Sequence, residues 1–363
     1  MPLPRGTRPD GAADLEAGHG WVLRLWLVVL VFGAITACRS IAVGIPPRDP
    51  GGEILRSRLV LTIAIFLVLA LLDAGRRSPR GHRTPGTVLR VLRARWPRRR
   101  LGLAAAGLLA YHAVYFCYHN LKSWDVFNAP RDAMLTRVDA WLFLGHSPAV
   151  LLHDVLGQHV ATYVLMVVYE SFPTIVSVSF VAAVVLVDRL RDGFVFLASA
   201  IWVWILGVGT YYLIPSLGPF HDRPQDFAGL PRTIVTDTQA KYMAQRAHLL
   251  AHPAAGDAFA QVSAFASLHV GVTCVILLML RYYGLRIAAR VMAVFLAATM
   301  VATIYLGWHF VVDDVAGVAI AVAAVWLGRL TIYPRGRRER DSPVPDATAS
   351  AHPSPSPSIT TSW

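Results

Sequence analysis

The sequence predicts an all-α integral membrane protein, a polytopic bundle of about eight membrane-spanning helices. Of the 363 residues, 55% are hydrophobic and only 15% are charged, a composition too apolar for an ordinary soluble domain. The apolar residues also gather in long uninterrupted runs, and arginines lie between these runs. Composition, run length and arginine placement therefore indicate the same fold class.

The apolar runs have the length that a spanning helix needs, which is about 20 residues. By this measure we expect eight spans, at residues 21–43, 55–72, 101–119, 160–187, 194–214, 264–283, 290–305 and 309–330. They divide the chain into a polar leader (1–20), three N-terminal spans with a basic loop (21–119), a second membrane domain (120–330) and a Pro/Ser/Thr/Ala tail expected to be disordered (331–363).

The arginines between the runs predict the orientation of the spans, because cytoplasmic loops carry an excess of Lys and Arg. The densest group follows the second run: Arg76, Arg77, Arg80, Arg83, Arg90, Arg93, Arg95, Arg98, Arg99 and Arg100. Others lie near residues 281–290 and after the last run. Both termini are therefore expected in the cytoplasm, with the protein in the cell membrane. Four arginines of the first outside loop oppose this orientation: Arg39, Arg48, Arg56 and Arg58.

Charge and cysteine usage exclude other classes of protein. The net charge of +12 lies between apolar runs and not on a stripe with interleaved aromatic residues, so no nucleic-acid partner is expected. Cys38, Cys117 and Cys274 form no CxxC pair, which argues against a disulfide framework or a zinc site and favours buried small side chains. The segment ending at Cys38 resembles a lipoprotein cleavage site, but the apolar run continues to about Val43 and favours a retained span.

Two outside segments are too long to be simple connectors. In 120–159, Leu135, Val138 and Leu142 recur at helical spacing, which predicts an amphipathic helix at the membrane interface. The segment 215–262 begins rich in Pro and Gly and carries several Arg, Lys and His residues. Long ordered loops are commonly functional, so these segments are candidates for the walls of a binding pocket.

Candidate catalytic residues lie where two spans begin. His309 and Asp313 are four residues apart, a spacing that places both on one face of a helix. His269 opens the sixth span, and the predicted topology places the starts of the sixth and eighth spans on the same, outer side of the membrane. Two histidines and one carboxylate are therefore expected at one depth.

These residue types suit chemistry at phosphorus. A carboxylate that holds a neutral imidazole makes it a good nucleophile, and a protonated second histidine can act as general acid. The arrangement requires no metal ion and no cofactor. A single histidine at a helix end is more often a solvated side chain; the His–Asp pair together with His269 favours catalysis.

The motifs around these residues resemble those of the type 2 phosphatidic acid phosphatase superfamily. Ser267-Leu268-His269-Val270-Gly271 and Tyr305-Leu306-Gly307-Trp308-His309-Phe310-Val311-Val312-Asp313 are most similar to the branch that contains inositol phosphorylceramide synthase, and Pro215-Ser216-Leu217-Gly218-Pro219-Phe220 resembles its Pro-rich first motif. The resemblance covers about residues 139–330.

The resemblance implies a phosphatase-like helical core and a role for each motif residue. His309 would form a phosphohistidine, Asp313 would orient it, and His269 would protonate the leaving group. The superfamily's Ser-Arg pair falls here on Ala302-Thr303, and its first-motif Lys falls on Ser216 if Arg223-Pro224 is the partner pair. Two phosphate-binding cations are then missing from their usual places. The expected substrate-binding residues are Ser267, Pro219, Arg223, Thr303 and Tyr305, with Arg232, Lys241 and Arg246 as further candidate cations.

The predicted function is transfer of a phosphoryl or phospho-headgroup from a lipid phosphate to an alcohol or to water. Asp139, Trp141 and the mid-span Glu170 are candidates for shaping the pocket. One alternative is a plain lipid phosphate or isoprenyl diphosphate phosphatase. Another is a proton-coupled transporter, but this sequence shows neither an internal repeat nor titratable groups spread along several helices.

Overall fold

The computed structural model describes residues 20–79, 81 and 83–334. Within that part of the chain every regular element is a helix, which confirms the predicted fold class. The expected polar leader and disordered tail lie outside the described residues, except for Gly20 and residues 331–334.

In the described residues, seven helical segments are long and apolar enough to cross a membrane. They are α2 (Gly20–Val43), α3 (Arg56–Arg77), α5 (Arg98–Trp124), the pair α8 (Val160–Glu170) and α9 (Phe172–Val185), α10 (Leu190–Leu213), α14 (Arg286–Tyr305) and α15 (Val311–Ile332). Their bounds agree with seven of the eight predicted spans to within about eight residues, an error typical at helix ends.

The remaining predicted span, 264–283, is shorter than expected. Helix α13 (Leu268–Tyr282) has only 15 residues. At 1.5 Å per residue it is about 22 Å long, less than the hydrocarbon core of about 30 Å. The chain before it, residues 258–267, is non-helical and mostly buried. Irregular backbone is tolerated within a membrane where surrounding protein buries it, so α13 needs the rest of the bundle around it.

The predicted span 160–187 is broken near its middle. Helix α8 ends at Glu170 and α9 begins at Phe172, with Pro173 in its first turn. Proline lacks the N–H that would continue the helix, and its ring clashes with the preceding turn. Tyr169 and Phe172, on either side of the break, both contact the ring of His269.

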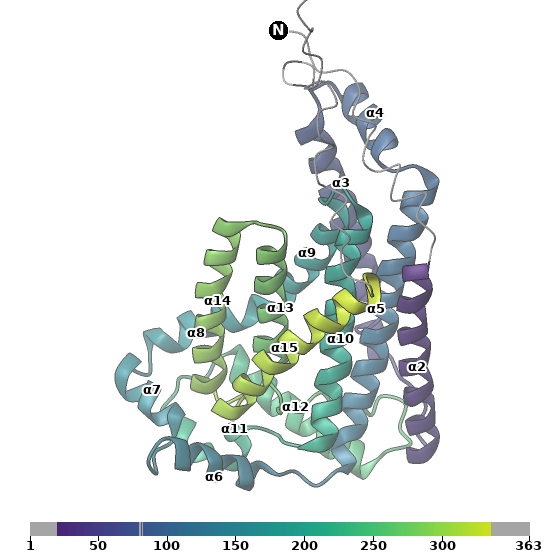
Figure 1. Cartoon of the computed structure of the whole chain (residues 1–363). Helices are drawn as coiled ribbons and strands as arrows, with labels where there is room; N and C mark the ends of the chain where they lie inside the picture. Colours follow the sequence, from purple (N-terminus) through teal and green to yellow (C-terminus); the bar gives the residue numbers. More distant parts are fainter. Residues whose placement is uncertain (1–19, 80, 82, 335–363) are drawn as a thin grey trace, which may run out of the picture.

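The short helices divide between the two ends of the bundle (Figure 1). One end carries α6 (Asp132–Leu142), α7 (Pro148–Leu156), α11 (Pro219–Asp222) and α12 (Ile234–Ala251), together with the 3-10 turns η1 (Pro50–Gly52), η2 (Asp125–Phe127) and η3 (Pro224–Phe227). The other end carries α4 (Pro85–Arg95). We refer to these as the loop end and the α4 end.

The first and last described helices have their outer termini together at the α4 end. Arg24 of α2 donates from Nε to the carbonyl of Thr331 at 2.7 Å, and Arg191 of α10 donates to Ile332 at 2.8 Å. Arg95 of α4 donates to the carbonyl of Val187, just before α10. The chain thus enters and leaves the described bundle on the side of the basic loop.

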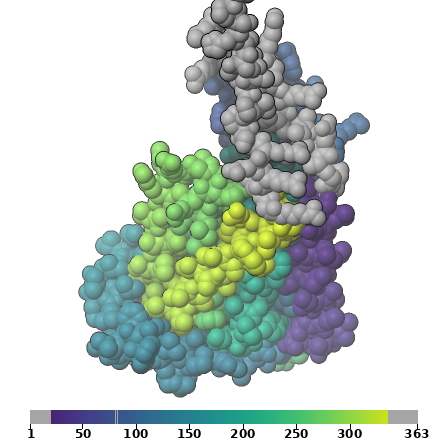
Figure 2. Space-filling view, in the orientation of Figure 1, coloured from purple at the N-terminus to yellow at the C-terminus, as the bar shows by residue number. Residues whose placement is uncertain are grey.

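Helix α10 forms the centre of the bundle. In its most apolar stretch 72% of the residues are buried, against 17–44% in the other six candidate spans. Helix α15 contacts α10 and α13 and crosses the visible face of the molecule obliquely (Figure 2). This tilt brings the start of α15 to the start of α13 at the loop end.

The three cysteines are free, as expected, but they are not all buried. Cys274 is buried and Cys117 is half-buried, whereas Cys38 is exposed. The reason is its place on α2, whose buried residues recur every three or four positions and leave Cys38 on the other face: Trp21, Leu25, Val29, Phe32 and Thr36.

Candidate active site

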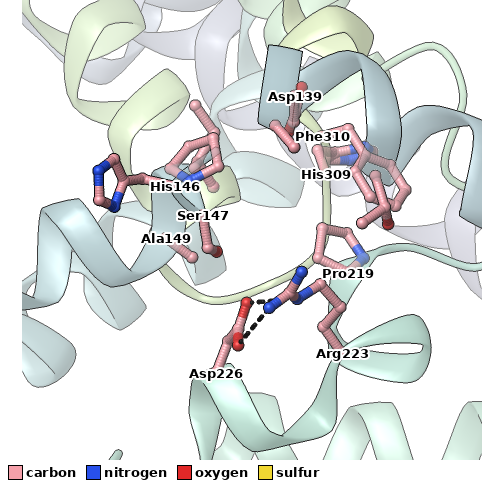
Figure 3. A pocket seen from close by; sticks show the side chains of 13 residues that line it. Asp139, His146, Ser147, Ala149, Pro219, Arg223, Asp226, His309 and Phe310 are labelled. Carbon is pink, nitrogen blue, oxygen red and sulfur yellow. Dashed lines mark hydrogen bonds and ion pairs between the residues drawn. The ribbon is translucent and has the colours of Figure 1, made fainter. Parts of the chain in front are cut away.

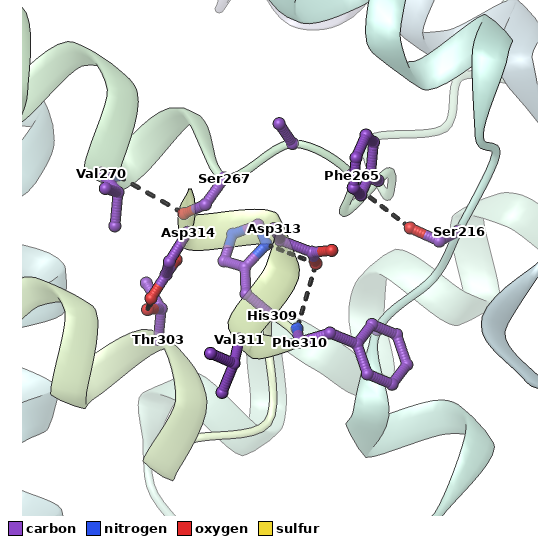
Figure 4. A network of polar contacts seen from close by, with 12 residues as sticks. Ser216, Phe265, Ser267, Val270, Thr303, His309, Phe310, Val311, Asp313 and Asp314 are labelled. Atoms are coloured by element: carbon purple, nitrogen blue, oxygen red, sulfur yellow. Dashed lines mark hydrogen bonds and ion pairs between the residues drawn. The ribbon is translucent and has the colours of Figure 1, made fainter. Parts of the chain in front are cut away.

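The structure brings His309 and Asp313 together, but not through a shared helix face. His309 precedes α15, and Phe310 is the residue that caps it. The Asp313 carboxylate reaches back from the first turn, accepting the Phe310 N–H at 3.0 Å and lying 3.3 Å from His309 Nδ1 (Figure 4). This is the geometry of an N3 acid that caps its own helix. The predicted contact exists, and its cause is the capped turn.

Helix α6 fixes the start of α15 from outside. Its Asp139 carboxylate accepts the N–H of Val311 at 3.1 Å. Leu135 and Asp139 are buried while Trp141 is 78% exposed, so the helix has the two-sided character that the sequence predicted. Asp139 therefore supports the catalytic turn, whereas Trp141 points away from it.

His269 is the second residue of α13, after the capping residue Ser267. Its ring is stacked on Tyr169 and tilted against Phe172, with both centroids at 4.2 Å. The centroids of His269 and His309 are 6.3 Å apart. A reacting group placed between the two rings, with a contact of about 3–3.5 Å to each, would span a similar distance. The structure thus places the three predicted catalytic side chains around one small space.

Close backbone contact between α13 and α15 sets this separation. The Ser267 N–H donates to the carbonyl of Asp313 at 2.9 Å. A Cβ on Gly317 would lie 2.4 Å from the carbonyl oxygen of Ser267, and one on Gly271 would lie 3.2 Å from that of Gly317. Glycine lets the two helices approach closely, as small residues commonly do between membrane helices.

The neighbouring carboxylate, Asp314, faces another direction. Both of its oxygens accept from the Thr303 hydroxyl, at 3.0 and 3.3 Å (Figure 4). Asp313 and Asp314 are both buried, yet of the two only Asp313 lies within hydrogen-bond distance of the His309 ring. Although Asp313 and Asp314 are adjacent on α15, their carboxylates therefore contact different partners.

Burial lowers the pKa of His309 to about 4, from an ordinary value of 6.5. The charge of Asp314 opposes this shift, and that of Lys122 adds to it. At neutral pH the imidazole is therefore uncharged and keeps a lone pair on one ring nitrogen, which is the state a nucleophile needs.

The Pro-rich first motif, residues 215–220, forms a turn beside the residues that precede His309. The Asp132 carboxylate accepts the N–H groups of Leu217 and Gly218 at 2.9 Å. Gly218 has a φ of 107° and its Cβ position lies 2.5 Å from the carbonyl of Trp308, so a side chain there would be strained and would clash. Phe220 N–H then donates to the Gly307 carbonyl at 2.9 Å, which ties the turn to the residues before His309.

Of the five predicted substrate-binding residues, Pro219 and Arg223 line a small cavity next to His309 (Figure 3). Arg223 is not free there, because its Nε lies 3.0 Å from Asp226. Ser267 caps α13 and Thr303 donates to Asp314, and both are fully buried. Tyr305 is also fully buried and donates to the Gly157 carbonyl at 2.6 Å, so it lines neither cavity that reaches His309.

A larger cavity, of about 230 Å³, is lined by both candidate histidines, His269 and His309. It far exceeds the 10–15 Å³ that one water needs on the same measure. Its wall includes aromatic residues and several polar groups that sequence analysis did not assign to the site: Arg58, Lys122, Tyr211, Tyr242, Gln261 and Trp308. Glu170, expected to shape the pocket, does line it. We define this space as the catalytic cavity.

The unassigned residues carry little local signal in the sequence. Lys122 and Arg58 lie at the ends of the spans α5 and α3, where basic residues are ordinary. Only the packing of α3 and α5 against the second half of the chain brings them to the histidines. Within the described residues, no group of three or more His, Cys, Asp or Glu is arranged to hold a metal ion.

Comparison with known proteins agrees with the motifs. No curated protein and no solved structure matches the chain. The family model for the PAP2 superfamily, the type 2 phosphatidic acid phosphatases, matches residues 133–327. This range is more than half of the chain and includes all three catalytic candidates. The chain therefore belongs to the PAP2 superfamily, which supports a phosphatase or phosphotransferase type of enzyme acting on a lipid phosphate.

Proposed function

We propose that this protein transfers a phosphoryl group, or a phosphoryl group that still carries its headgroup, from a lipid phosphate to an alcohol or water through a phosphohistidine on His309. The observation that carries the proposal is the His309–Asp313 contact at 3.3 Å, facing His269 across the catalytic cavity. Superfamily membership supports the phosphorus chemistry.

In the first step His309 attacks the phosphorus. Its Nδ1–H is held by Asp313, so the lone pair of Nε2 forms the N–P bond while the bond from phosphorus to the leaving oxygen breaks. The carboxylate stabilises the positive charge that develops on the ring. His269, protonated, gives its proton to the leaving oxygen.

In the second step an acceptor hydroxyl attacks the phosphohistidine. Neutral His269 takes the acceptor's proton while the N–P bond breaks, which returns both histidines to their initial states. The first turn of α13 lies beside this space, and the N-terminal end of a helix favours an anion.

The polar wall of the catalytic cavity supports an alcohol acceptor, in the manner of the inositol phosphorylceramide synthase branch. Glu170, Gln261 and the tyrosine hydroxyls can hydrogen-bond a polyol beside the histidines. A plain phosphatase would need only water there, so this lining favours transfer over hydrolysis.

The proposed location is the cell membrane, with the loop end outside the cytoplasm. Helix α4, which carries Arg90, Arg93 and Arg95 of the basic loop, lies at the opposite end of the bundle from the short helices of the loop end (Figure 1). By the positive-inside rule the α4 end, with both described termini, then faces the cytoplasm.

The test is to supply purified protein with phosphatidic acid, an isoprenyl diphosphate or phosphatidylinositol, each with and without inositol or diacylglycerol, and to identify products by mass spectrometry. We expect the phosphoryl group, with or without its headgroup, to leave the lipid and to appear on the added alcohol or as a hydrolysis product. We also expect an acid-labile phosphoprotein that is absent in His309→Ala. Equal turnover by His309→Ala would overturn the mechanism, and release of inorganic phosphate alone would identify a phosphatase. Proton-coupled lipid movement without chemistry would identify a transporter.

A further inference from the structure

The catalytic cavity contains a lysine that the superfamily motifs do not include. Lys122 lies in the last turn of α5, and its ammonium group is 5.6 Å from the centroid of the Tyr211 ring. The acidic residue that acts on it electrostatically, Asp125, is hydrogen-bonded instead to Asn128 at 2.8 Å and Ser263 at 3.0 Å. Among the described residues, no carboxylate lies within salt-bridge distance of Lys122.

The position of Lys122 relates it to both catalytic histidines. All three residues line the same cavity. The Lys122 charge acts electrostatically on the rings of His269 and His309. A phosphate bound between the histidines would therefore lie within the field of this ammonium group.

The two motif positions that usually carry cations hold neutral residues, and two of the arginines that could replace them are paired with carboxylates. Ser216 and Thr303 occupy the two motif positions in the sequence. Arg223 is paired with Asp226, and Arg232 is 82% exposed and paired with Asp237 at 2.7 Å. A half-buried ammonium group without a direct salt bridge is costly, and a bound anion reduces that cost.

We propose that Lys122 binds the phosphate group of the substrate, and that α5 thereby completes an active site whose histidines lie in the second half of the chain. This proposal deepens the proposed function and rests on it. Lys122 lies outside residues 133–327, the part matched by the superfamily. Arg58, at the start of α3, lines the same cavity and adds positive charge from the same N-terminal part.

The chain offers a matched control in its only other lysine, Lys241. The sequence made Lys241 a candidate cation, but it is exposed on α12 and lines neither cavity that reaches His309. The experiment compares wild type with Lys122→Met, Lys122→Arg and Lys241→Met, all as the full chain. Binding of inorganic phosphate is measured by calorimetry in detergent, and binding of phosphatidic acid by titration in lipid nanodiscs. Thermal unfolding of each variant reports its structural integrity.

We expect Lys122→Met to weaken binding of both ligands by about 10- to 100-fold, the effect of one charge-assisted contact. Lys122→Arg should recover most of the affinity, and Lys241→Met should bind as wild type. Unchanged binding in Lys122→Met, or an equal loss in Lys241→Met, would overturn the proposal. So would a loss that arginine does not recover and that accompanies a lower unfolding temperature, since that pattern indicates a structural lysine.

The two ligands and His309→Ala separate the remaining interpretations. Weakened binding of inorganic phosphate alone would assign Lys122 to free phosphate and overturn its role toward the lipid. If His309→Ala turns over normally, the proposed function fails while the binding result for Lys122 stands. If His309→Ala is inactive and Lys122→Met binds normally, the Lys122 proposal alone fails.

Discussion

Replacing Asp313 with asparagine tests the proposed nucleophile with almost no change in shape. The carboxylate accepts from two donors, His309 Nδ1 and the Phe310 N–H. Both contacts end on the same oxygen, Oδ2, so an asparagine whose carbonyl oxygen takes that place can accept both, but it carries no negative charge to stabilise the ring. If its amide group faces His309, the ring proton moves to Nε2 and the attacking lone pair is lost.

The expected magnitude follows from these contacts. A hydrogen bond to a charged group contributes about 1.5–3 kcal/mol, or about 10- to 100-fold in rate. The wrong tautomer costs more, since Asp→Asn in a Ser-His-Asp triad lowers kcat by about 10⁴. We therefore expect Asp313→Asn to lower kcat by about 10- to 100-fold if the carbonyl oxygen faces His309, and by up to about 10⁴-fold if the amide group does, with a smaller change in KM.

The matched control is Asp314→Asn, the next carboxylate on the same helix. Asp314 contacts Thr303 and lies outside hydrogen-bond distance of the His309 ring, so this change should cost less than tenfold in kcat, about 1.4 kcal/mol. Steady-state kinetics with the best substrate and thermal unfolding of both variants provide the measurements. If Asp313→Asn keeps activity within threefold of wild type, or loses less than Asp314→Asn, the assigned role of Asp313 is wrong.

Further expectations concern proton transfer and helix contact. Burial lowers the pKa of His309 to about 4, so the neutral nucleophile should persist down to that pH. In a pH–rate profile, the fall of kcat/KM on the acid side that this residue causes should therefore lie near pH 4. A fall near pH 6.5 that disappears in His309 variants would contradict this. His269→Gln should lower kcat by about 10²- to 10⁴-fold for an alkyl phosphate but far less for a p-nitrophenyl ester, which needs no general acid; equal losses for both esters would argue against the general-acid role. Gly317→Ala should lower the unfolding temperature because its Cβ would lie 2.4 Å from Ser267 O, whereas Gly209→Ala, with nothing within 4 Å, should not; equal unfolding temperatures would show that the contact between α13 and α15 can relax.

The fold was largely predictable because hydropathy reports the membrane directly. Seven predicted spans correspond to helical segments long enough to cross, and arginine placement anticipated the shared end of the first and last helices. The prediction failed where length and break points depend on tertiary packing. Residues 264–267 are as apolar as the helix that follows them, yet they remain non-helical because Ser267 caps α13. Pro173 was visible in the sequence, but its effect on the span depends on what the broken helix contacts.

The site was predictable in its residues more than in its geometry. The spacing of His309 and Asp313 suggested a helical pair, whereas the structure joins them through a capping turn that begins at Phe310. Tyr305 belongs to the same motif, but its side chain points to Gly157, away from the cavity. A motif identifies a segment, and the rotation of that segment decides which of its side chains reach a substrate.

The N-terminal spans contribute to the site in a second way, through the loop that leads to His269. Arg48 donates to the carbonyl of Ala258 at 2.6 Å, and its own N–H donates to the Asn120 side chain at 2.7 Å. The Ser123 hydroxyl accepts the Ala260 N–H at 3.0 Å. These contacts hold the non-helical chain that continues into α13, so α5, which carries Lys122, also helps to position the chain before His269. Helix α5 thus both positions the chain before His269 and places Lys122 in the cavity. Removing the N-terminal spans would disturb the position of His269 as well as the charge of the cavity. Only point substitutions such as Lys122→Met can separate the two effects.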